Sequence, residues 1–214
     1  MDYSLYSRAS TVIHAVQGAS LFLWGAAVVY GLFKPQSRVP AAGASFMLAA
    51  GAAGLYMILE YLGGGSPDRM FSALQDRGSF YLLVGQSLLF CTAGFVAVMG
   101  LISSGMKKFW RIFFVIIVLG IAAVYFMYPY GLVDTARRQA AEWHNIIGAL
   151  TAAAAAAELA GVFLHGKAAR AVLAVLLFLC SALLLQYRES DTAYFRQGAV
   201  TVKSFVGADE PAPF

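Results

Sequence analysis

Six long apolar runs constrain the fold of this chain more than any other feature of its sequence. They lie at about residues 10–33, 41–63, 79–104, 108–128, 140–165 and 169–187. An α-helix needs about 20 residues to cross a hydrocarbon core of about 30 Å, and it satisfies its own backbone hydrogen bonds inside lipid. The sequence therefore predicts an all-α integral membrane bundle of six transmembrane helices.

The composition of the chain supports the same class of protein. Hydrophobic residues make up 60% of it and charged residues 12%, against roughly 25% charged residues in soluble domains. We expect residues 1–188 to form one six-helix transmembrane domain and residues 189–214 a polar C-terminal tail. The lipid bilayer is the first expected partner.

The net charge of +4 comes from Lys and Arg residues near the ends of the runs. It indicates membrane topology and not a nucleic-acid surface, so no nucleic-acid partner is expected. Three connections, 34–40, 105–107 and 166–168, together with the helix starts beside them, contain basic residues and no acid. These basic residues are Lys34, Arg38, Lys107, Lys108, Arg111, Lys167 and Arg170. The positive-inside rule makes these connections cytoplasmic, and six spans then leave the N- and C-termini on the non-cytoplasmic side.

Two stretches 130 residues apart match each other, "RASTVIHAVQGA" from Arg8 and "RQAAEWHNIIGA" from Arg138. They share an arginine, a histidine and a glycine: Arg8 and Arg138, His14 and His144, Gly18 and Gly148. We interpret the first two and the last two spans as possible copies of one helical hairpin, with coincidence as the alternative. Each histidine would lie about 9 Å beyond its arginine along the helix. The two imidazoles are therefore expected at similar depth on one side of the membrane.

Two imidazoles at equal depth are the ligand set of a low-spin haem b. Gly18 and Gly148, one turn deeper on the same helix faces, would leave space for a flat group. Arg8 and Arg138 would hydrogen-bond the haem propionates, and the rings of Phe22, Trp24 and Tyr30 would line the haem edge. With His165 the chain has three histidines, which supports one bis-histidine haem and not two.

Two other interpretations of the same histidines remain open. His14 and His144 can hydrogen-bond across a helix interface without any cofactor, or they can bind another metal together with a nearby carboxylate. The haem interpretation makes the protein an electron carrier, with a quinone as a possible redox partner.

Glu158 is the second candidate functional residue. It interrupts "TAAAAAAELAG", Thr151 to Gly161, and is expected near the middle of the fifth run, where an ionisable side chain is costly unless it faces protein or water. A catalytic role as a proton relay, or a cation site, is one interpretation. The other is a protonated carboxyl bonded to a neighbouring helix, for example to Gln86.

The best functional hypothesis from sequence is a membrane subunit that binds one haem b and transfers electrons. The alternatives are a non-catalytic subunit or assembly partner of a larger membrane complex, and a small proton-coupled or cation transporter that uses Glu158. Other membrane subunits or further copies of the chain are expected partners in each case. Walker-type, His-Glu-x-x-His and Gly-x-Ser-x-Gly motifs are absent from the sequence, so nucleotide and hydrolase chemistry lack support.

Overall fold

The structure is a computed structural model that describes residues 3–34, 37–76, 80–103, 105–128, 134–164 and 167–188. Every regular element in this part of the chain is an α-helix. The helices are α1 (Tyr3–Phe33), α2 (Val39–Gly63), α3 (Pro67–Asp76), α4 (Phe80–Ile102), α5 (Lys107–Met127), α6 (Asp134–Phe163) and α7 (Lys167–Gln186).

Six of these helices are long and apolar enough to cross a membrane. The candidate spans are Arg8–Phe33, Val39–Tyr61, Tyr81–Ile102, Lys107–Met127, Ala140–Phe163 and Lys167–Gln186. Each boundary lies within two residues of the one expected from sequence. The predicted all-α membrane bundle is confirmed, and the chain is a multi-pass membrane protein.

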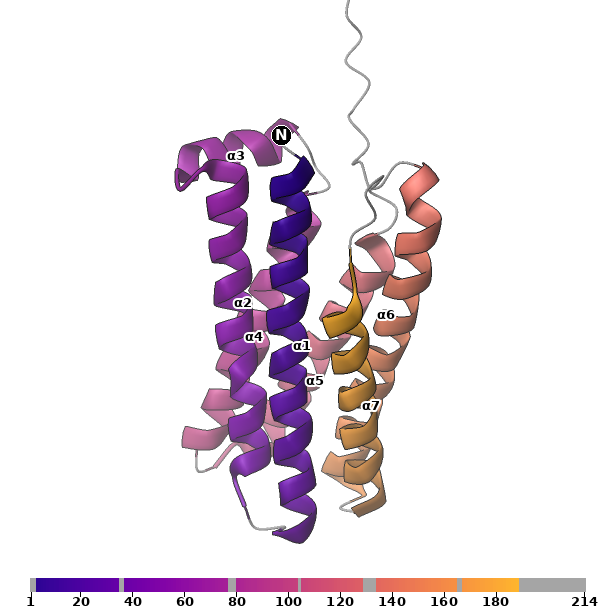
Figure 1. Cartoon of the computed structure of the whole chain (residues 1–214). Helices are drawn as coiled ribbons and strands as arrows, with labels where there is room; N and C mark the ends of the chain where they lie inside the picture. The colour runs from indigo at the N-terminus through magenta and orange to yellow at the C-terminus, as the bar shows by residue number, and fades with distance from the viewer. Residues whose placement is uncertain are drawn as a thin grey trace, which may run out of the picture.

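The six spans pack as a closed ring in the order α1, α2, α4, α5, α6 and α7, with α7 against α1. Figure 1 shows them side by side and roughly parallel to one another. The helices α1, α4 and α6 finish at the end where α2, α5 and α7 begin. We call this the basic end, because it carries Lys34, Arg38, Lys107, Lys108, Lys167 and Arg170. We call the opposite end the α3 end.

The short helix α3 differs from the expected structure, which had only the six spans. Helix α2 ends at Gly63, and the φ angles of 53° and 77° at the next two residues, Gly64 and Gly65, are left-handed. The Gly64 amide donates a hydrogen bond to the Leu59 carbonyl. A new helix then begins at Pro67, whose fixed φ suits a first helical turn. It packs against α2 and crosses the end of the bundle (Figure 1).

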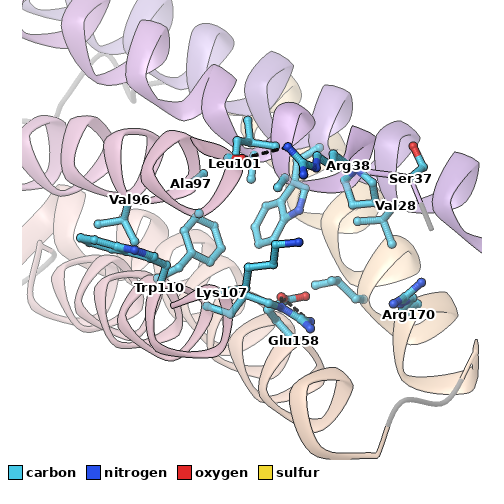
Figure 2. Close-up of a pocket in the computed structure, with 18 residues that line it drawn as sticks. Val28, Ser37, Arg38, Val96, Ala97, Leu101, Lys107, Trp110, Glu158 and Arg170 are labelled. Atoms are coloured by element: carbon cyan, nitrogen blue, oxygen red, sulfur yellow. Dashed lines mark hydrogen bonds and ion pairs between the residues drawn. The ribbon is translucent and has the colours of Figure 1, made fainter. Parts of the chain in front are cut away.

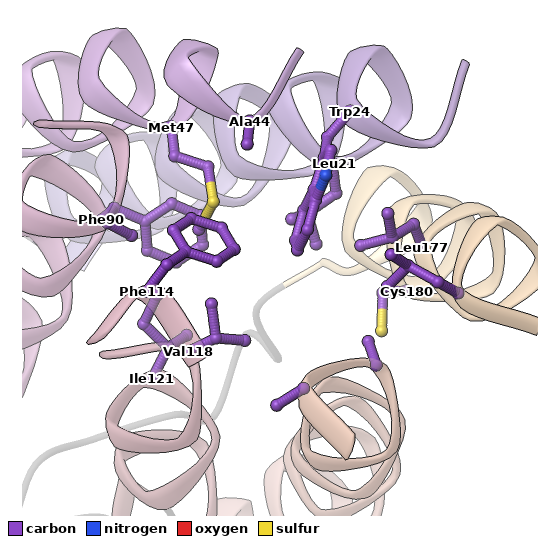
Figure 3. Packing of buried hydrophobic residues seen from close by; sticks show 14 of the residues in the cluster. Leu21, Trp24, Ala44, Met47, Phe90, Phe114, Val118, Ile121, Leu177 and Cys180 are labelled. Atoms are coloured by element: carbon purple, nitrogen blue, oxygen red, sulfur yellow. The ribbon is translucent and has the colours of Figure 1, made fainter. Parts of the chain in front are cut away.

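The middle of the ring is filled by apolar side chains from the helices around it. Figure 3 shows Leu21 and Trp24 of α1, Phe90 of α4, Phe114 of α5 and Leu177 of α7 converging there. Lipid is as apolar as these side chains, so close packing and not burial from water holds such helices together. This packed layer separates the two polar regions described next.

The C-terminal tail, residues 189–214, and the third histidine, His165, lie outside the described residues. The expected side of each terminus in the cell stays a prediction.

Candidate functional site

The structure places His14 of α1 and His144 of α6 in contact, although 130 residues separate them. Their ring centroids lie 5.7 Å apart at an interplanar angle of 81°, and the two residues are 3% and 2% exposed. Both lie toward the α3 end, in the first half of their spans. The helices α1 and α6 flank α7 on either side, so the two imidazoles meet across the inner face of α7.

Both imidazoles are held by their own helices in the same way. The Nδ1 atom of His14 lies 2.7 Å from the Ser10 carbonyl oxygen, and that of His144 lies 2.8 Å from the Ala140 carbonyl oxygen. A carbonyl oxygen only accepts a hydrogen bond, so Nδ1 carries the proton in each neutral ring. The lone pair that a metal or a proton would use is then on Nε2 in both residues.

Three buried tyrosines surround the imidazole pair. The Tyr187 ring lies 4.4 Å from that of His14 and 5.0 Å from that of His144, measured between centroids. Tyr128 stacks on His144 at 4.6 Å, and Tyr125 lies 6.0 Å from it. We call these five residues the imidazole–tyrosine cluster.

The aromatic residues expected from the sequence to lie beside the histidines are elsewhere in the structure. Phe22 and Tyr30 lie on the exposed surface, and Trp24 belongs to the apolar core. All three lie too far along α1, since Phe22 is already eight residues beyond His14, or about 12 Å. Tyr187 and Tyr128 were not among the aromatic neighbours expected for the histidines. Each lies one residue beyond the end of a span, where the sequence gives no sign of whether a ring points inward.

The two glycines serve close helix packing and not an open space. A Cβ atom on Gly18 would lie 3.0 to 3.2 Å from atoms of Leu185, Ser181 and Leu184 on α7. One on Gly148 would lie 3.1 to 3.2 Å from Phe126 and Ala122 on α5. Neighbouring helices therefore occupy the room that the sequence assigned to a flat group. In each case the contact is with the helix that comes before it in the order around the ring, α7 before α1 and α5 before α6. A duplicated hairpin would give the same arrangement. The duplication itself stays a prediction.

The two arginines of the matched stretches lie at the α3 end with exposed side chains. Arg138 is paired with Glu142 one turn later, at 3.6 Å between Nε and Oε1, and both side chains are well solvated. Arg8 is also exposed. Nothing in these contacts ties either arginine to the imidazoles.

A second polar group continues from the imidazole–tyrosine cluster toward the middle of the bundle. Gln17 lies one turn beyond His14 on the same face of α1. Its Oε1 accepts hydrogen bonds from Tyr125 Oη at 3.0 Å and from Gln86 Nε2 at 3.3 Å. Gln86, the example given of a partner for a protonated Glu158, bonds to Gln17 instead, and Glu158 bonds to Arg111 near the other end of its helix.

Glu158 lies five residues before Phe163, the last residue of α6, so its expected place near the middle of the span is corrected. Its Oε1 is 2.7 Å from Arg111 Nη2 and 2.9 Å from Arg111 Nε. This ion pair borders a cavity of about 270 Å³ at the basic end. Figure 2 shows Lys107 in the middle of the group, between Arg38 and Glu158.

In the part of the chain that the structure describes, three or more His, Cys, Asp or Glu side chains nowhere gather closely enough to hold a metal ion. The carboxylate expected beside His14 and His144 is thus not among the described neighbours. Searches against protein-family models, curated proteins and solved structures find no match to this chain.

Proposed function

We propose that His14 and His144 form a metal centre inside the membrane and that the protein uses this centre to transfer electrons. The observation that carries the proposal is the meeting of two buried imidazoles whose Nδ1 atoms are both held by backbone carbonyls. Such a bond orients a ligating ring and makes its Nε2 atom more basic. Metal-binding histidines usually have this second hydrogen bond.

The spacing of the rings fits a single metal ion better than a haem iron. With metal–nitrogen bonds of about 2.0 to 2.1 Å, two imidazoles at a tetrahedral angle hold their centroids roughly 5 Å apart, and two on opposite sides of an iron hold them more than about 6 Å apart. Edge-to-face ring contacts without a metal have the same range of separations. The observed separation is 5.7 Å. Burial among Tyr125, Tyr128 and Tyr187 would keep water away from such a centre.

Haem b is the group that the sequence favours for this pair, and a single metal ion is the alternative. The packing favours the ion, because Tyr187 touches both imidazoles and α7 packs closely at Gly18. A haem would need Tyr187 to turn away and the helices to separate. With haem, Arg8 and Arg138 stay the candidates for the propionates, and a quinone stays a possible redox partner.

The transporter hypothesis that uses Glu158 loses support from the structure. The carboxylate is already compensated by Arg111, and the cavity beside it is rich in positive charge. A cation would be repelled there. A non-catalytic subunit remains the second candidate; the contacts of Gly18 with α7 and of Gly148 with α5 lie within the chain and do not bear on a partner.

The test is an absorption spectrum and a metal analysis of the protein purified in mild detergent, oxidised and dithionite-reduced. The variants are His14→Ala and His144→Ala, with His165→Ala as the matched control for loss of a histidine. We expect one bound metal per chain in the wild type and in the control, and less than a tenth of that in either test variant.

A Soret band with a reduced α band would identify the group as haem b, and bound metal without these bands would identify a metal ion. Helical circular dichroism checks that each variant is folded. A colourless, metal-free wild type, or test variants that keep their metal, would overturn the proposal and leave the histidines as contacts between helices.

A further inference from the structure

The cavity at the basic end is lined by residues of all six spans. Its floor is apolar and buried, formed by side chains such as Trp24, Val28, Phe114 and Leu173. Its mouth is more exposed and contains Arg38 and Lys107. Phe114 lies seven residues beyond Lys107 on α5, or about 10 Å deeper. The cavity therefore runs from a charged mouth at the membrane surface to an apolar floor inside the bilayer.

The charged side chains of this cavity are strongly unbalanced. Its lining contains Arg38, Lys107, Arg111 and Arg170, and one carboxylate, Glu158, which is a formal excess of three positive charges. Arg111 is already paired with Glu158. Among the described residues Lys107 and Arg170 form no ion pair. Arg38 donates a long hydrogen bond of 3.4 Å to the Leu101 carbonyl and forms no ion pair with a residue that the structure describes.

We propose that this cavity binds an anionic phospholipid, with its phosphate among Arg38, Lys107 and Arg170 and the start of an acyl chain on the apolar floor. The direction of the cavity matches that of a lipid in the bilayer, with the headgroup at the surface and the tail toward the middle. Basic pockets between transmembrane helices on the cytoplasmic side bind such headgroups. A volume of about 270 Å³ is just below the roughly 300 to 1,000 Å³ of ligand pockets, so it holds the headgroup end and not the whole lipid.

The experiment is a titration of delipidated protein in mild detergent, followed by native mass spectrometry. The probes are phosphatidylglycerol, phosphatidylcholine with the same acyl chains, and glycerol phosphate, which has the headgroup charge but no tail. We expect phosphatidylglycerol to bind at least about tenfold more tightly than either of the others.

The test variant is Lys107→Gln/Arg170→Gln. The matched control is Lys108→Gln/Lys167→Gln, which removes the same charge from the same end of the molecule at residues that do not line the cavity. We expect the test variant to lose at least about tenfold in phosphatidylglycerol affinity and the control less than about threefold, since each basic side chain near an anionic lipid contributes about 1 kcal/mol. The double variant Lys107→Arg/Arg170→Lys should keep the binding, which separates loss of charge from loss of fold.

Equal affinity for the two phospholipids would overturn the proposal, as would equal losses in the test variant and its control. Glycerol phosphate binding as tightly as phosphatidylglycerol would identify a free phosphate ester as the ligand and overturn the lipid assignment. The residues involved are separate from His14 and His144, so neither result bears on the proposed metal centre.

Discussion

At the scale of single residues, the ion pair between Arg111 and Glu158 has the clearest energetic consequence. The Glu158 side chain is 14% exposed and that of Arg111 is 38% exposed. Removing one partner leaves the other charged and poorly solvated, which is more destabilising than removing both. Solvent around Arg111 reduces the effect relative to a fully buried pair.

We expect Arg111→Met to lower the free energy of unfolding by about 1 to 3 kcal/mol, and Arg111→Met/Glu158→Met to restore most of this loss. Reversible unfolding in mixed detergent micelles would measure both. The control is Arg138→Met, which breaks the exposed pair with Glu142 and should change stability by less than about 0.5 kcal/mol. An Arg111→Met protein as stable as the control would contradict this account.

At the scale of the helices, the sequence predicted the six spans closely but missed α3. A span is set by the length of an apolar run, which is a local property. The helix α3 is short and polar, so no long apolar run indicates that a new helix begins at Pro67. The sequence also did not predict which faces of the spans contact one another, because small residues are spread over many faces of these helices.

Gly94 tests the contact between α2 and α4. A Cβ atom there would overlap the backbone nitrogen of Leu48, which cannot move without shifting α2. We expect Gly94→Ala to destabilise the protein by about 1 to 3 kcal/mol through overpacking.

The matched control for this contact is Gly85→Ala in the same helix, where a Cβ atom would meet nothing within 4 Å. It should be neutral or stabilising by up to about 1 kcal/mol, because alanine favours the helix more than glycine does. Thermal unfolding of both variants in one detergent would compare them. Similar losses in the two would count against close α2–α4 packing.

At the scale of the whole molecule, the closed ring separates two regions of different chemistry. The imidazole–tyrosine cluster lies toward the α3 end, and the basic cavity lies at the basic end. Apolar residues such as Met47, Val118 and Ile121 fill the space between them (Figure 3). The orientation of the protein in its membrane therefore determines which side of the membrane each region faces.

We expect the basic end to face the cytoplasm, because its connections contain basic residues and no acid. Cysteine substitutions introduced one at a time at Ser37 and Ser66 lie at opposite ends of the bundle. The wild type, which retains Cys91 and Cys180 within its spans, is the control for background labelling. In bacterial cells a membrane-impermeant maleimide should label Ser66→Cys in intact cells and Ser37→Cys only after permeabilisation. The reverse pattern would show that the orientation is wrong.

The sequence by itself determined that this chain forms six membrane helices and which residue types stand out within them. Both follow from local properties, the length of apolar runs and the cost of polar groups in lipid. The matched arginine, histidine and glycine positions also identify His14 and His144 as a pair without any knowledge of the fold.

Only the tertiary structure decided what these residues touch. Closure of the ring brought α1, α6 and α7 together, so Tyr187 reached both imidazoles and α7 took the space beside Gly18. It also paired Glu158 with Arg111, 47 residues away. Contacts between distant segments depend on how all six helices pack together. The apolar sequence of any single helix gives little indication of which of its faces contacts a neighbouring helix.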